Sequence, residues 1–143
     1  MPQLLLTGVD VLQHPALTMK ILIADDQEEC RNLLRDMFVE ETNVELTMAH
    51  DGAEAWWLLT EPNRRFDLGI FDLRMPNVDG LALIERIRTS SHARHLPIIL
   101  CTGISDRDTV GRAAKFAINH YVVKPYMPDG LREKIRALTP RRG

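Results

Sequence analysis

A chain of 143 residues has the length of one domain, and its 45% hydrophobic and 27% charged residues are ordinary for a globular core. The formal charge of −2 gives no basic excess for a nucleic-acid partner, and no apolar run approaches the roughly 18 residues of a membrane span. The two cysteines, Cys30 and Cys101, lack the spacing of a zinc site and are too few for a disulfide framework, which favours a reducing, cytoplasmic compartment.

Residues 1–18 precede the first strand-like segment. They contain no Lys or Arg and a single acid, Asp10, and their longest apolar run is Leu4-Leu5-Leu6. A secretion signal needs a basic region and a longer continuous apolar core. We therefore interpret residues 1–18 as an N-terminal extension, followed by one domain over residues 19–138 and a tail over residues 139–143.

Five short apolar runs have the character of strands. They are Ile21–Ala24, Val44–Ala49, Leu68–Phe71, Ile98–Cys101 and Tyr121–Val123. Four of them are nearly continuous, which is typical of parallel strands buried on both faces. The run from 44 to 49 alternates more with polar residues and therefore suits an edge strand.

Amphipathic helix patterns fill the gaps between these runs. The spacing predicts helices over about 27–40 and 52–60, around 81–87 and 110–117, and over 131–138, where Pro140 stops the last one. Asp26 with Glu29, and Asp51 with Glu54, have the spacing of capping boxes. Five β-α units in about 120 residues predict an open α/β fold, a doubly wound five-stranded parallel sheet of order 2-1-3-4-5 with five helices.

Polar residues follow the carboxyl ends of four strands: Asp25-Asp26, Asp72, Thr102 and Lys124-Pro125. With the order 2-1-3-4-5, the first and third strands are neighbours at the topological switch point, where such sheets bind ligands. Asp25, Asp26 and Asp72 should therefore face one another, with Thr102 and Lys124 beside them. Three carboxylates so close together repel one another, and a Mg²⁺ ion, which prefers oxygen ligands, would relieve that repulsion.

The same residues suit phosphoryl chemistry. Lys124 offers a point charge and Thr102 a hydroxyl donor. No G-x-x-x-x-G-K-[ST] loop is present in the sequence, so a bound nucleotide is not indicated. The economical hypothesis is that one carboxylate accepts the phosphoryl group itself, which requires in-line positioning and charge neutralisation from the protein.

Four segments along residues 19–138 carry these side chains: Lys20-Ile-Leu-Ile-Ala-Asp-Asp26, Phe66-Asp-Leu-Gly-Ile-Phe-Asp72-Leu-Arg-Met-Pro-Asn-Val-Asp-Gly80, Cys101-Thr102-Gly103 and Tyr121-Val-Val-Lys124-Pro125. In this order, and each at a strand end, they resemble the receiver domain of response regulators from two-component signalling systems. The resemblance is to the stand-alone form, similar to chemotaxis regulators, and it implies a flavodoxin-like fold.

The resemblance implies a role for each residue of the predicted site. Asp72 would be the phosphoacceptor, taking the group from a histidine kinase or histidine phosphotransferase. Asp26 and Asp72 would bind Mg²⁺ directly, together with the backbone carbonyl of Arg74, and Asp25 would act mainly through water. Lys124 would bind the phosphoryl oxygens.

The resemblance also implies a switch. Thr102 would turn inward to hydrogen-bond the phosphoryl group, and Tyr121 would then move from an exposed to a buried rotamer. This change would alter a protein-interaction surface on the fourth helix, fifth strand and fifth helix, which a downstream protein recognises. The Lys124–Pro125 bond is expected to be cis. Arg74 and Ile104 would flank the phosphoryl pocket and favour a moderately long-lived phosphoryl state.

Other functions remain as alternatives. A relay intermediate would pass the phosphoryl group to a histidine phosphotransferase, and a receiver-like adaptor would act without phosphorylation. A phosphohydrolase with an aspartate nucleophile usually needs a second acid two residues later, where this chain has Arg74. We expect no enzyme activity beyond self-phosphorylation from a phosphodonor and autodephosphorylation. We also expect a monomer or weak dimer with no nucleic-acid partner, no membrane insertion and no attached effector, since only residues 140–143 follow the last helix.

Several residues also have a purely structural interpretation. Asp26 could act as a helix N-cap, and Asp79 is interpreted as one. Tyr121 could be a packing residue of a strand. Of the adjacent Trp56 and Trp57, one should be part of the core and the other partly exposed.

Overall fold

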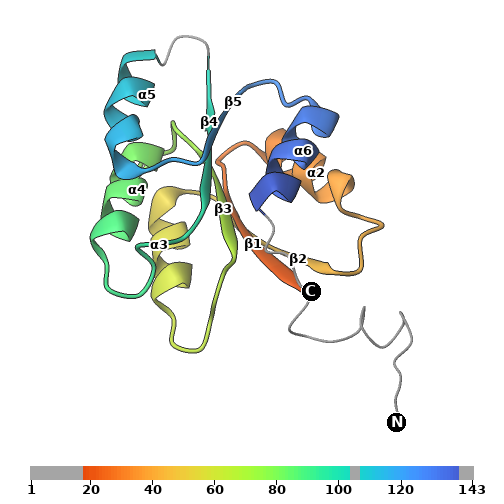
Figure 1. Ribbon diagram of the computed structural model, residues 1–143, viewed down its shortest axis with the longest axis horizontal. Coiled ribbons are helices and arrows are strands. Elements are labelled where there is room, and N and C mark those ends of the chain that lie inside the picture. The colour runs from red at the N-terminus through yellow and green to blue at the C-terminus, as the bar shows by residue number, and fades with distance from the viewer. Residues whose placement is uncertain (1–17, 104–106, 139–143) are drawn as a thin grey trace.

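Five parallel strands form one sheet, in the order β2-β1-β3-β4-β5, in the computed structural model (Figure 1), which describes residues 18–103 and 107–138. The strands are β1 (Met19–Ala24), β2 (Val44–Ala49), β3 (Leu68–Asp72), β4 (Ile98–Thr102) and β5 (His120–Val123). The helices are α2 (Glu28–Met37), α3 (Gly52–Thr60), α4 (Gly80–Thr89), α5 (Arg107–Ala113) and α6 (Pro128–Leu138), with a 3₁₀ turn, η3 (Ala114–Phe116), directly after α5. The predicted doubly wound fold and its strand order are confirmed.

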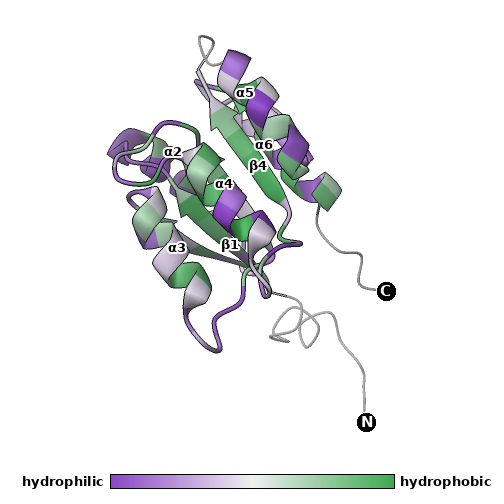
Figure 2. Cartoon of the chain, turned by 90° about the vertical axis from the view of Figure 1, so that its left-hand side faces the viewer, coloured by the Kyte–Doolittle hydropathy of each residue, from purple (hydrophilic) through white to green (hydrophobic). Residues whose placement is uncertain are grey.

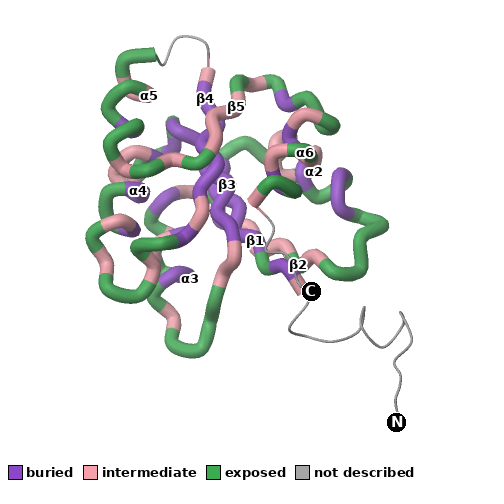
Figure 3. Tube along the Cα trace, viewed as in Figure 1, coloured by how far each residue is buried: buried purple, intermediate pink, exposed green. Residues whose placement is uncertain are grey.

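Helices cover both faces of the sheet, with α3, α4 and α5 on one face and α2 and α6 on the other (Figure 1). Successive side chains of the central strand β1 point to opposite faces and so belong to two separate cores. Leu22 and Ala24 pack with α3 and α4. Ile21 and Ile23 pack with α2 and α6. Both faces of β1 are therefore buried (Figure 3), which explains its continuous apolar sequence.

The helices are amphipathic, as the spacing of apolar residues in the sequence predicts. Apolar residues line the strands and the helix faces that meet them, and polar residues face outward (Figure 2). Trp57 is 61% exposed while Trp56 is half-buried against the core, so the prediction for this pair is confirmed. Among the described residues, no helix is both long and apolar enough to cross a bilayer.

Element boundaries agree best for β2 and α3, which begin and end at the predicted residues. The fourth predicted helix differs, because it begins at Arg107 and its second half tightens into η3. Ala117 then takes a left-handed φ of 59°, which stops the helix without a glycine. Residues 1–17 of the predicted extension, Ile104 and the predicted tail lie outside the described residues.

Helix capping confirms the N-cap half of one predicted box, whose Glu54 side chain accepts from the His50 backbone N–H instead of that of Asp51, and contradicts the other box. The Glu54 backbone N–H donates to Asp51 Oδ1 at 2.8 Å, so the cap of α3 forms as expected. The box predicted for Asp26 and Glu29 is wrong, because α2 has Gln27 as its N-cap and no side-chain cap. The carboxylate of Asp26 lies instead in the acidic cluster at the sheet edge.

Arg88, near the end of α4, joins the loop before β4 to the turn between η3 and β5. Its guanidinium donates to four backbone carbonyls, those of Arg94, Leu96, Phe116 and Ala117, at 2.6–3.0 Å. We expect Arg88→Met to lower the free energy of unfolding by about 3 kcal/mol, because all four carbonyls lose their donor and the hydrogen bonds to Leu96 and Phe116 are partly buried. Urea denaturation measures the change.

The matched control is Arg86→Met on the same helix. Arg86 is exposed, and its side chain has no hydrogen-bond partner within the described part of the chain. We expect its free energy of unfolding to stay within about 0.5 kcal/mol of wild type. Equal losses in the two variants would show that the Arg88 hydrogen bonds do not stabilise the fold.

Candidate functional site

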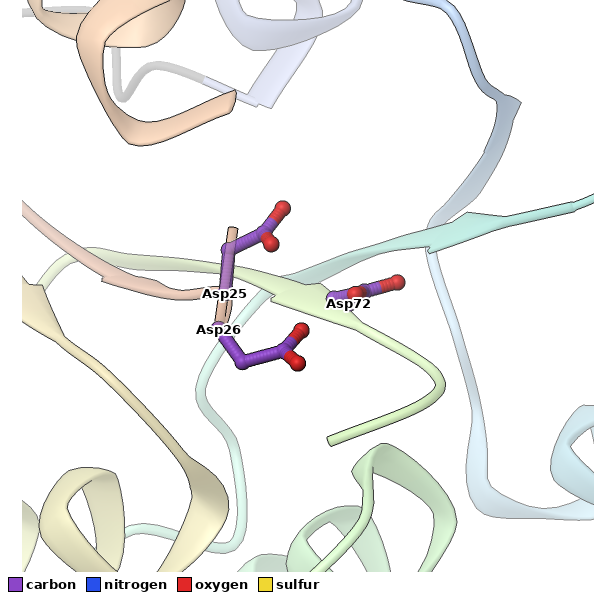
Figure 4. Close-up of side chains that lie close together, drawn as sticks. All are labelled: Asp25, Asp26 and Asp72. Carbon is purple, nitrogen blue, oxygen red and sulfur yellow. The ribbon is translucent and has the colours of Figure 1, made fainter. Parts of the chain in front are cut away.

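Three carboxylates meet at the carboxyl edge of the sheet. Asp25 and Asp26 follow β1, and Asp72 ends β3. These strands are paired neighbours, and their register places Ala24 opposite Phe71, so the residues that follow emerge side by side. One oxygen from each carboxylate lies within 4.8 Å of the others. Figure 4 shows these three side chains close together at the ends of the two strands. The structure thus brings together the three acids that the sequence analysis grouped.

The Asp25 carboxylate is only 1% exposed and is held by three donors. The backbone N–H of Gln27 donates to Oδ1 at 2.9 Å. The Lys124 ammonium and the Tyr126 hydroxyl both donate to Oδ2, at 2.9 Å and 3.1 Å. Because buried polar oxygens need hydrogen-bond partners, these three donors satisfy the Asp25 carboxylate and fix its orientation.

Lys124 lies between the two buried carboxylates. Its Nζ atom is 2.9 Å from Asp25 Oδ2 and 3.2 Å from Asp72 Oδ2. Burial alone would lower the pKa of Lys124, but the hydrogen bond to Asp25 and the charges of both acids outweigh it and raise this pKa. Lys124 is therefore a permanent cation aimed at the Asp72 carboxylate.

The surroundings of Asp72 shift the pKa of its carboxyl group. Asp72 is buried, with 7% of its surface exposed. Burial, and then the charge of Asp25, raise the pKa of Asp72 to about 6, although Lys124 and the backbone N–H of Arg74 oppose the shift. Near neutral pH the ionised Asp72 carboxylate is thus poorly solvated, and a cation or a covalent bond at its oxygen would relieve that condition.

Thr102 and Tyr121 lie on the neighbouring strands. Thr102 ends β4 and is 3% exposed, and its backbone carbonyl accepts a hydrogen bond of 2.8 Å from the Lys124 backbone N–H. Tyr121 on β5 pairs with Leu100 and is half-buried against the core that contains α3 and α4. Burial raises the pKa of the Tyr121 phenol. Thr102 thus borders the acidic cluster, whereas Tyr121 lies farther along the sheet, on its outermost strand.

The loop from β3 to α4 is held close to the acidic cluster. Asp79 caps α4, accepting from the Ala82 backbone N–H at 2.8 Å, which confirms its predicted structural role. The Gly80 backbone N–H donates to the Leu73 carbonyl at 2.8 Å. A Cβ at position 80 would lie 2.4 Å from the backbone oxygen of Asp72. Close packing against the backbone at the end of β3 therefore requires a glycine at position 80.

Two residues of the site are absent from the sequence prediction, Gln27 and Tyr126. Both directly follow a predicted motif, Asp25-Asp26 in one case and Lys124-Pro125 in the other. The Lys124–Pro125 peptide bond is cis. The sequence does contain a signal for Tyr126, because this residue directly follows the predicted Lys124-Pro125 motif. A tyrosine, unlike a phenylalanine, needs a hydrogen-bond partner for its hydroxyl when it is buried.

The donor set fits a divalent cation. All three side chains offer carboxylate oxygens, two of them from buried residues, and no nitrogen or sulfur ligand accompanies them in the described cluster. Oxygen ligands of this kind, completed by waters, are what Mg²⁺ prefers. The residues present are therefore suited to hold Mg²⁺ at the end of β3.

We expect the affinity for Mg²⁺ to decrease as the pH falls through about 6, the pKa of Asp72. Mg²⁺ binds the ionised carboxylate, so below this pKa each pH unit lowers the affinity by up to about tenfold. Isothermal titration calorimetry at a series of pH values measures the effect. An affinity that stays constant between about pH 7 and about pH 5 would contradict the contribution of Asp72.

Comparisons with known proteins agree with this geometry. A family model described as the response regulator receiver domain matches residues 21–136. A chemotaxis protein CheY homolog from Campylobacter jejuni is 33% identical over 117 residues, which cover 82% of this chain and 89% of the relative. The chemotaxis protein CheY of Pseudomonas aeruginosa is 33% identical over 123 residues, covering 86% of this chain and 98% of that protein. The solved signal receiver domain of a signal transduction histidine kinase from Syntrophus aciditrophicus has a TM-score of 0.76 and 30% identity, covering 85% of this chain and 90% of that one.

Proposed function

Because the chain belongs to the response regulator receiver family, we propose that it is a signalling switch in which Asp72 accepts a phosphoryl group from a phosphohistidine. The donor would be a histidine kinase or a histidine phosphotransferase. An Asp72 carboxylate oxygen forms a bond to phosphorus while the bond from phosphorus to the histidine nitrogen breaks. The imidazole leaves with the electron pair of that bond and takes up a proton from solvent.

The observation that carries this proposal is the contact of one ammonium group with two buried carboxylates. Lys124 Nζ is 3.2 Å from Asp72 Oδ2, so it already lies where the oxygens of a group bound to Asp72 would come. Thr102 lies buried at the adjacent strand end and can offer a hydroxyl to the same group. Asp72 is the proposed acceptor because its ionised carboxylate is poorly solvated, since burial and the charge of Asp25 raise its pKa to about 6.

Mg²⁺, held by Asp25, Asp26, Asp72 and the backbone carbonyl of Arg74, would neutralise charge on the transferring group when bound. Side chains of the protein would orient the site and bind the phosphoryl group. Asp25 and Lys124 fix the orientation of the site, and Lys124 turns from Asp25 toward the phosphoryl oxygens once these are present. Arg74, two residues after the acceptor, would shield the acyl phosphate and favour a moderately long-lived state.

The output surface that we propose is formed by α5, β5 and α6. Val123, which ends β5, is 51% exposed, and Met127, directly before α6, is 71% exposed. A contiguous apolar patch is a common feature of protein-protein interaction sites, and these two side chains would contribute to one. Phosphorylation would reach this surface through Thr102 and Tyr121, and a cytoplasmic partner protein would bind it, with the switch itself acting as a monomer or weak dimer.

Two related functions use the same acceptor. In a relay, the group on Asp72 would pass to a second histidine. In a phosphohydrolase, a second acid would protonate the leaving group, but the residue two positions after Asp72 is Arg74, a cation. An adaptor that works without phosphorylation would not need Lys124 to contact the acceptor, and that contact favours the switch.

Intact-mass spectrometry of the full chain after incubation with acetyl phosphate tests the proposal. With Mg²⁺ present we expect the mass to increase by one phosphoryl group, and with EDTA we expect no increase. A protein that takes up no phosphoryl group under either condition, and shows no change in tryptophan fluorescence with beryllofluoride, would not be a phosphorylation switch.

A further inference from the structure

The Tyr126 hydroxyl lies inside the candidate site. Tyr126 is 6% exposed, and its hydroxyl donates to Asp25 Oδ2 at 3.1 Å. Burial, and then the neighbouring Cys101 and Asp25, raise the pKa of the phenol well above its usual value, so the hydroxyl keeps its proton. The side chain is therefore a neutral, permanent donor to a buried carboxylate.

Tyr126 and Lys124 share one acceptor atom. Both donate to Oδ2 of Asp25, and Lys124 also contacts Asp72 and the Gln27 side chain. The ring of Tyr126 lies 5.8 Å from Lys124 Nζ, so the two side chains are packed together. Any displacement of Lys124 toward a group on Asp72 weakens the donation to Asp25 from that side.

We infer that Tyr126 is a positioning residue, whose hydroxyl holds Asp25 when Lys124 turns from Asp25 to the phosphoryl group on Asp72. The inference rests on the proposed function. Asp25 is 1% exposed, so water cannot replace a lost donor freely. With the hydroxyl on the same oxygen, the carboxylate stays satisfied while the ammonium moves, and the phosphorylated state is stabilised relative to the free one.

The hydroxyl can be removed without changing the packing. Tyr126→Phe keeps the ring that fills the core beside Leu131 and Ile135 and that faces Lys124. In the free protein of this variant, Lys124 and the Gln27 backbone still hold Asp25. The defect should therefore be confined to the state in which Lys124 has moved, a pattern that a general loss of packing would not produce.

The experiment compares two affinities of the full chain. Beryllofluoride at saturating Mg²⁺ serves as the phosphoryl probe, and Mg²⁺ alone is titrated separately, both by tryptophan fluorescence. For Tyr126→Phe we expect the beryllofluoride affinity to fall about tenfold and the Mg²⁺ affinity to change by less than about twofold. Unchanged beryllofluoride affinity, or equal losses of both affinities, would overturn the inference.

Cys101→Ala is the matched control, because the Cys101 thiol is the other polar neighbour of the same hydroxyl. We expect both affinities of this variant to stay within about twofold of wild type. If Cys101→Ala lost as much beryllofluoride affinity as Tyr126→Phe, the important contact of the hydroxyl would be the one with Cys101. That result would overturn the proposed role of the contact with Asp25. If wild type itself bound no beryllofluoride, the proposed function would fail, which is a distinct result from a variant that binds as well as wild type.

Discussion

Asp72→Asn is expected to take up no phosphoryl group from acetyl phosphate and Mg²⁺, and to unfold at a higher urea concentration than wild type near neutral pH. An amide lacks the anionic oxygen that attacks phosphorus, so intact-mass spectrometry should show only the unmodified chain. The stability gain has a separate cause, which is the burial of an ionised carboxylate. Asn has nearly the same shape as Asp and carries no charge.

The sign of the stability effect follows from the direction of the pKa shift. In the unfolded chain the pKa of this carboxyl is 3.8, and in the folded protein it is about 6. The folded state therefore binds the proton more tightly, and ionised Asp72 costs the folded protein about 3 kcal/mol above that pH. The advantage of Asp72→Asn should be complete above about pH 6, should decrease as the pH falls, and should vanish only below about pH 4, where both states of wild type become protonated. Urea denaturation in EDTA across this range measures it.

Asp79→Asn is the matched control for the same chemical change. Asp79 is exposed and serves as the N-cap of α4, a role that Asn fills equally well. This variant should be phosphorylated like wild type and should show no comparable stability gain. Phosphorylation of Asp72→Asn at the wild-type level would place the acceptor elsewhere and contradict the proposed function.

The layout of the site could be predicted because it depends on chain order alone. Parallel strands place their carboxyl ends on one edge, so Asp25, Asp72 and Lys124 had to converge once the strand order was known. The same reasoning gives no information on hydroxyl directions or on which donors satisfy a buried acid. The contact of Tyr126 with Asp25 joins residues 101 positions apart and leaves no periodic pattern in the sequence.

Local rules failed where tertiary contacts outweighed them. The spacing of Asp26 and Glu29 satisfies a capping box, yet the carboxylate of Asp26 belongs to the acidic cluster and α2 has no side-chain cap. The end of the fourth helix has no glycine or proline, and Ala117 takes the left-handed conformation there. The Arg88 guanidinium donates to the Ala117 carbonyl at 3.0 Å, and this hydrogen bond helps to hold the turn.

Gly80→Ala is expected to displace the backbone of Asp72, the proposed phosphoryl acceptor. A Cβ on residue 80 would lie 2.4 Å from the Asp72 oxygen and 2.8 Å from the Leu73 Cα atom, and both are backbone atoms that cannot rotate away. Either α4 or the end of β3 must shift. We expect a loss of about 3 kcal/mol in the free energy of unfolding. Urea denaturation measures this loss.

The shift should also slow phosphorylation of the molecules that remain folded. A displacement of the Asp72 backbone misaligns the attacking oxygen with Lys124, and small misplacements of reacting groups commonly cost about a hundredfold in rate. The rate is measured with acetyl phosphate at a temperature where circular dichroism shows the variant to be folded. A folded variant that reacts at the wild-type rate would show that α4 moves instead of β3.

Gly111→Ala separates this steric effect from the general effect of adding a methyl group to a helix. Gly111 lies within α5, and a Cβ there would meet no atom within 4 Å. Alanine is the better helix former, so this variant should gain about 0.5–1 kcal/mol and be phosphorylated at the wild-type rate. The same substitution thus should have opposite effects on stability at the two positions. Of these two positions, only position 80 places the added carbon against the main chain of Asp72, the proposed phosphoryl acceptor, so only there should stability and phosphorylation be lost together.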